Sequence, residues 1–132
     1  MFSYDDTPDT LKIATDTVIQ RLSVEEGLDL PVAFDWEDFD AFQTHEMSFN
    51  ELNKLYDVFA EEMKKAGYDT MLYGSLYRLE DIWTDTDSRP IWLAQYADKT
   101  SYKGPYMIWQ ASDIGRIDGI NTDVDMDIMT AQ

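Results

Sequence analysis

The chain has 132 residues, of which 44% are hydrophobic, so it suits a single domain over residues 1–132 with a packed core. The formal net charge of −17 repels nucleic acid and anionic membranes, and neither is an expected partner. The absence of cysteine excludes disulfides, thiol nucleophiles and thiolate metal ligands.

The first predicted element is a helix over residues 7–27. Thr7 suits the N-cap, Pro8 suits the first helical position, and Gly27 can end the helix. A single stripe along the helix carries its apolar residues, Leu11, Ala14, Val18 and Leu22. A strand over residues 30–37 is expected to follow it.

The clearest helix in the sequence covers residues 47–67. Ser48 and Glu51 form the pattern of a capping box at its start, and Gly67 is the candidate C-cap. Residues spaced three and four apart form its apolar face, namely Leu52, Leu55, Tyr56, Phe59 and Met63.

Short strands and one short helix are predicted for the rest of the chain. The helix covers residues 75–83, and the strands cover residues 70–75, 89–96, 104–110 and 120–129. Helices that alternate with short buried strands predict an α/β fold with a parallel sheet. The strands end in polar or aromatic residues, and the active site of an α/β barrel lies at that end of its strands.

Two carboxylates follow the first predicted strand. Asp35 and Glu37 are two residues apart, so in a strand they share a face while Trp36 turns away. Like charges at that distance raise one pKa, and an apolar surround raises it further. Glycoside hydrolysis needs one protonated and one ionised carboxyl group. On spacing alone, the favoured alternative is a solvated strand end that leads into an acidic loop.

Other ligand and cofactor patterns are weak. His45, the only histidine, lies in the polar run QTHEMS and suits a plain loop residue, and no serine stands in a GxSxG context. The tail places Asp123, Asp125 and Asp127 at alternate positions but lacks the glycine and glutamate of a calcium-binding EF-hand loop. We therefore expect no metal and no cofactor.

The aromatic content points to a neutral ligand. Aromatic residues make up 14% of the chain, and a sugar ring can pack on Trp and Tyr beside an acidic surface. Trp109 with Gln110, at a predicted strand end, is the best candidate pair, although the tryptophans are individually more typical of packing. The alternative is that the charge serves only solubility. No apolar run reaches the ~20 residues of a membrane helix, and the start of the chain shows no signal-peptide pattern.

The segments LPVAFDWEDFD, MSFNELNKLYDVFAEEMKKAGYDTMLYGS and RPIWLAQYADKTSYKGPYMIWQASDIGRIDGINTDVDMDIM resemble the glycoside hydrolase family 25 lysozymes, found as bacterial autolysins and phage endolysins. The resemblance implies an irregular β/α barrel without a metal. It also implies an N-acetylmuramidase that cleaves the β-1,4 bond between N-acetylmuramic acid and N-acetylglucosamine in peptidoglycan, in the cell wall or outside the cell.

The resemblance also implies site residues. Glu37 matches the general acid/base, and Asp35 matches the carboxylate that stabilises the substrate's 2-acetamido group, the internal nucleophile of a substrate-assisted reaction. Asp125 is the best match for a further acid near the tail, and Asp118 is a weaker one. The residues that resemble the lining of the substrate groove are Tyr73, Trp92, Tyr96, Trp109 and Gln110.

The chain departs from the family at its start. Family members begin with a strand that carries an early site aspartate and a second strand, and neither pattern is present here. We therefore expect the C-terminal two-thirds of a family 25 barrel, lacking its first strands. Open sheet edges predict self-association, or completion by an N-terminal fragment. The alternative function is an inactive remnant that binds glycan or self-associates.

Overall fold

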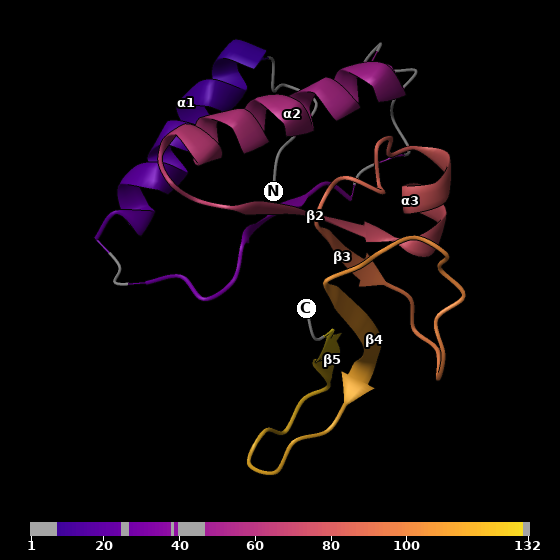
Figure 1. The fold of residues 1–132 in the computed structure, drawn as a ribbon. Coiled ribbons are helices and arrows are strands. Elements are labelled where there is room, and N and C mark those ends of the chain that lie inside the picture. The colour runs from indigo at the N-terminus through magenta and orange to yellow at the C-terminus, as the bar shows by residue number, and fades with distance from the viewer. Residues whose placement is uncertain (1–7, 25–26, 38, 40–46, 131–132) are drawn as a thin grey trace. The chain divides into compact units, whose positions relative to one another are not determined.

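The computed structural model describes residues 8–24, 27–37, 39 and 47–130. The chain divides into two compact units, Met1–Leu72 and Tyr73–Gln132. In chain order (Figure 1), the helices and strands are α1 (Pro8–Leu22), β1 (Val32–Asp35), α2 (Phe49–Lys65), β2 (Thr70–Ser75), α3 (Leu76–Asp81), β3 (Ile91–Ala94), β4 (Ile108–Gly115) and β5 (Val124–Met129).

The strands form one mixed sheet in the order β1-β2-β3-β4-β5. The division into units falls within β2, whose first half belongs to the first unit and whose second half belongs to the second. The predicted α/β class is confirmed. Among the described strands the sheet is open, with β1 and β5 at its edges. Self-association through open edges stays a prediction.

In the first unit, α1 packs against α2 (Figure 1). Leu11 and Thr15 are fully buried, and the Thr15 hydroxyl donates to the Leu11 carbonyl at 2.7 Å, which allows a polar side chain to lie in the core. The helix ends at Leu22, earlier than Gly27, where the sequence analysis ended it. The hydroxyl of Ser23 donates to the Gln20 carbonyl at 2.7 Å and so pairs an open carbonyl of the last turn.

Local signals set both ends of α2, as predicted. The Ser48 hydroxyl accepts from the backbone N–H of Glu51 at 3.1 Å, and the Glu51 carboxylate accepts from the backbone N–H of Ser48 at 2.7 Å. At the other end Gly67 adopts a φ of 89°, which a residue with a side chain rarely adopts. Its backbone N–H donates to the Lys64 carbonyl and that of Tyr68 donates to the Met63 carbonyl, each at 3.0 Å.

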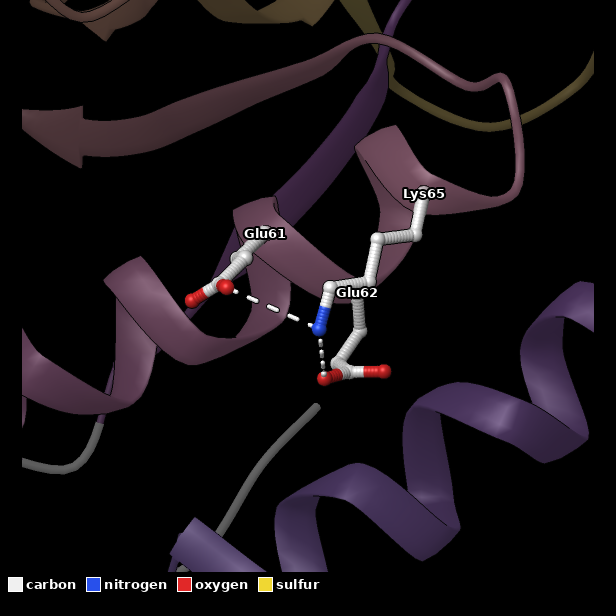
Figure 2. Close-up of polar contacts among 3 residues, drawn as sticks. All are labelled: Glu61, Glu62 and Lys65. Atoms are coloured by element: carbon white, nitrogen blue, oxygen red, sulfur yellow. Dashed lines mark hydrogen bonds and ion pairs between the residues drawn. The ribbon is translucent and has the colours of Figure 1, made fainter.

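The solvent-facing side of α2 carries ion pairs near its C-terminus. Lys65 lies between Glu61 and Glu62 (Figure 2), with nitrogen–oxygen distances of 3.5 and 3.3 Å. The hydrogen bond to Glu62 and the charges of both glutamates raise the pKa of Lys65. Lys65 and Glu61 are exposed and Glu62 is half-buried. Ion pairs at the surface contribute little to stability, so α2 is held in place mainly by its apolar face.

That apolar face is the core of the first unit. All five predicted residues of the α2 face are buried. Phe34 of β1 is fully buried against the helix, with its ring 5.6 Å from that of Tyr56 in an edge-on arrangement and 5.4 Å from that of Phe59. This packing fixes the face that β1 turns toward α2.

In the second unit, β3 runs parallel to β4, with Trp92 opposite Ile108 and Ala94 opposite Gln110. β5 runs antiparallel to β4, whereas the sequence predicted a parallel sheet. The connection 116–123 is too short for a parallel crossover, which needs about a dozen residues or more. The pairing of β4 with β5 is close at Gly115, where a Cβ atom would overlap the side chain of Met126.

No helix among the described residues is long and apolar enough to cross a membrane.

Candidate functional site

The Asp-x-Glu pair lies at the end of β1, in the first unit. A hydrogen bond from the Val32 backbone N–H to the Asp69 carbonyl, at 2.9 Å, ties the start of β1 to the chain just before β2. Phe34 is fully buried and Trp36 nearly so, because alternate residues of the strand pack into the core. Asp35 is half-buried and Glu37 is exposed, as alternation predicts for the other face.

Asp35 is the carboxyl group of the pair that the fold perturbs. Burial raises the pKa of Asp35 from its usual 3.8 to about 6, and the neighbouring charge of Glu37 adds to the rise. One of its carboxyl oxygens, Oδ1, is buried and has no hydrogen-bond partner among the described residues. The sequence analysis expected one raised pKa in this pair, and the structure places it on Asp35.

Asp35→Asn should stabilise the chain above pH 6 and change little below pH 4. The folded chain binds the Asp35 proton more tightly than the unfolded chain, so wild-type stability falls as the pH rises from about 4 to about 6. Because the group is half exposed and partly screened by solvent, we expect a gain of about 1 kcal/mol or less. Thermal melts of the wild type and of Asp35→Asn between pH 4 and pH 8 measure this gain in stability. An equal shift for the exposed control Asp29→Asn, or a gain that is the same at pH 4 and pH 8, would contradict the explanation.

A second cluster of candidate residues lies on one face of the sheet in the second unit. The registers place Trp92 beside Ile108, and Gln110 between Ala94 and Asp127. Residues opposite one another on paired strands share a face. Trp92, Gln110 and Asp127 therefore lie on the same face of β3, β4 and β5.

Direct contacts join this cluster. The Tyr73 hydroxyl donates to Gln110 Oε1 at 2.8 Å, and the Tyr96 hydroxyl donates to the same atom at 3.1 Å. The rings of Tyr73 and Trp92 pack edge-on, 5.1 Å apart. The indole N–H of Trp92 donates to Asp127 Oδ1 at 2.8 Å. We call Tyr73, Trp92, Tyr96, Gln110 and Asp127 the aromatic–amide cluster.

The structure brings together four of the five residues predicted for the groove lining. Trp109 is the exception. It lies on the opposite face of β4 from Gln110, is nearly buried, and donates its indole N–H to the Gln95 carbonyl at 2.8 Å. This placement favours packing, which the sequence analysis also considered typical of the tryptophans. Its role in the groove stays a prediction.

Asp118 and Asp125, the two acids near the tail that match the family site, lie in different elements of the second unit. Asp118 is exposed in the connection between β4 and β5, and Asp125 is exposed on β5, two residues before Asp127 and thus on the same face. The sequence analysis considered Asp127 only as a metal ligand and missed its bond to Trp92. Alternation in DVDMDIM places Asp125 and Asp127 together, but only the register reveals Trp92 as a neighbour. His45 lies outside the described residues.

Two carboxylates near the tail, Asp123 and Asp127, have partners within the protein. Asp123 pairs with Arg116 at 2.9 Å across the β4–β5 connection, and Asp127 accepts from Trp92. Within the described part of the chain, no three His, Cys, Asp or Glu side chains are grouped so that they could hold a metal ion.

A pair of carboxyl groups beside each other at the end of a strand is an arrangement that glycoside hydrolases use. The family model of the glycosyl hydrolases family 25 matches residues 7–120. The chain therefore belongs to glycosyl hydrolase family 25. A search of the curated proteins gives no match.

Three solved structures share the fold. A family 25 glycosyl hydrolase from Bacillus anthracis gives a TM-score of 0.71 at 20% identity, over 99% of this chain and 62% of that one. GHIP of Streptococcus pneumoniae, a glycosyl hydrolase 25 and virulence factor participating in host cell invasion, gives 0.73 at 20% identity, over 94% and 54%. The spore cortex lytic enzyme SleM of Clostridium perfringens gives 0.67 at 20% identity, over 97% and 46%. The chain thus spans about half to three-fifths of the length of these proteins.

Proposed function

We propose that the chain is a peptidoglycan hydrolase that cleaves the β-1,4 bond between N-acetylmuramic acid and N-acetylglucosamine. The observation that carries the proposal is the Asp-x-Glu pair at the end of β1, with one perturbed carboxyl group, in a member of glycosyl hydrolase family 25. The spore cortex lytic function in the name of SleM supports a wall substrate. Peptidoglycan glycan strands are then the partner, and the cell wall is the place of action.

In this proposal Glu37 is the general acid and base. Its exposed side chain can reach a substrate and exchange a proton with water. Protonated Glu37 donates its proton to the glycosidic oxygen as the bond to the anomeric carbon breaks. The acetamido carbonyl oxygen of the same sugar forms the new bond to that carbon. Ionised Glu37 then removes a proton from the water molecule that opens the resulting ring.

Asp35 stabilises the positive charge that develops on the acetamido nitrogen. A pKa of about 6 leaves this carboxyl group mostly ionised at neutral pH, as that role requires. A half-buried carboxylate also interacts with a nearby cation more strongly than one in open water.

Analysis of new reducing ends tests the proposal. Purified peptidoglycan is incubated with the chain, and the new ends are reduced with borohydride and identified by mass spectrometry. A muramidase produces reduced N-acetylmuramic acid. Reduced N-acetylglucosamine would show that the other glycan bond is cleaved, and no new ends with retained binding to the wall would support the non-catalytic alternative. The matched control is the same digestion with the Glu80→Gln chain, whose glutamate is exposed on α3.

A further inference from the structure

The amide of Gln110 is held in one orientation by two tyrosines. Its oxygen accepts the hydroxyl protons of Tyr73 and Tyr96, at 2.8 and 3.1 Å. An amide oxygen has two lone pairs, so both are used. The side chain is only 4% exposed, which leaves little room for solvent to compete for that oxygen. The two hydroxyls therefore decide which end of the amide remains available.

The available end is the amino group. Within the described residues, Gln110 Nε2 has no hydrogen-bond partner, although the side chain is more than nine-tenths buried. Buried donors in folded proteins are normally paired. Nε2 itself is not fully enclosed by the protein, so an acceptor on a ligand can reach this oriented and unpaired donor.

The surroundings define the kind of ligand. Tyr96 is 55% exposed, so the aromatic–amide cluster reaches the surface there. Trp92 packs edge-on against Tyr73 and adds apolar surface on which a sugar ring can lie. The bond from Trp92 to Asp127 fixes the orientation of that indole ring.

We propose that Gln110 Nε2 donates a hydrogen bond to the acetamido carbonyl oxygen of an N-acetyl sugar in the bound glycan. Tyr73 and Tyr96 are positioning residues that keep the amino group facing the ligand. A carbonyl oxygen only accepts, which matches a site whose own acceptor is already saturated. A sugar hydroxyl can also accept from Nε2, but it cannot donate to Gln110 in return because both lone pairs of the amide oxygen are used. The inference rests on the proposed function and adds a residue that selects for acetylated sugars.

The test compares two tetrasaccharides that differ only in acceptor strength. One is the peptidoglycan tetrasaccharide of alternating N-acetylglucosamine and N-acetylmuramic acid, and the other carries thioacetamido groups, whose sulfur is a weak acceptor. Equilibrium binding is measured in the Glu37→Gln background to prevent cleavage. The chain should prefer the oxygen ligand by about five- to tenfold, as one neutral hydrogen bond predicts.

Gln110→Glu should reduce this preference to about one. Glutamate keeps an oxygen for both tyrosine hydroxyls and loses only the donor, so a purely structural role for Gln110 would leave the preference unchanged. Gln20→Glu makes the same substitution at an exposed position of α1 and is the matched control. Tyr96→Phe should weaken the preference for the oxygen ligand while Gln110 itself is unchanged. If Gln110→Glu does not fold, this variant tests whether Gln110 Nε2 donates to the acetamido oxygen.

Other outcomes would overturn the inference. A preference unchanged in both Gln110→Glu and Tyr96→Phe would refute it, and muramidase products from the wild-type chain would then leave the proposed function standing. Failure of the chain both to bind either tetrasaccharide and to release reducing ends would refute the two together.

Discussion

Glu37→Gln should lower the turnover of purified peptidoglycan by on the order of 10²-fold or more. The substitution keeps the size and hydrogen-bonding capacity of the side chain but removes the proton that must pass to the leaving oxygen. Because Glu37 is exposed and follows the end of β1, its replacement should leave the fold intact. The loss should therefore appear in kcat, with KM little changed.

Initial rates of reducing-end release, measured at several substrate concentrations, separate these effects. Glu80→Gln removes an exposed carboxylate elsewhere in the chain and should keep full activity. A thermal melt of each variant checks that folding is unchanged. Turnover of Glu37→Gln close to that of the wild type would exclude Glu37 as the general acid.

Phe34→Ala should lower the free energy of unfolding by about 3–5 kcal/mol. Phe34 is 0% exposed, and its ring packs against Tyr56 and Phe59 of α2. Truncation leaves a cavity between strand and helix that neighbouring backbone cannot fill. The strand that loses this contact also carries Asp35, so the raised pKa of that carboxyl group should fall as water enters.

Chemical denaturation measured by fluorescence and circular dichroism gives this free energy. Phe49→Ala is the matched control, because it removes the same ring from a position that is 47% exposed at the start of α2. It should cost about 1 kcal/mol or less. A similar cost at both positions would show that Phe34 does not hold β1 against α2.

Local patterns were enough to predict α2 closely. The capping box, the apolar face and the positive φ of Gly67 each depend on residues within a few positions of one another. The same holds for the alternation that exposes Glu37 and buries Trp36. These features follow from the periods of helix and strand, which any stretch of sequence displays by itself.

Burial and register could not be predicted in this way. The spacing of Asp35 and Glu37 predicts two interacting carboxyl groups, but burial of Asp35 by the fold decides which pKa rises. Trp109 and Gln110 lie on opposite faces of β4, which strand alternation by itself predicts for adjacent residues. The sequence analysis did not apply alternation when it named them as one ligand pair.

In the aromatic–amide cluster, too, local features could be predicted from the sequence, whereas contacts between residues far apart in the chain could not. Residue order alone shows that aromatic and polar residues end several strands, and that acids alternate along β5. Strand pairing in the folded chain is what brings Tyr73 and Tyr96 to a single oxygen of Gln110, and Trp92 to Asp127. Such contacts depend on which strands pair and in which direction. The short connection before β5 made that last pair antiparallel, and so placed Asp127 opposite Gln110.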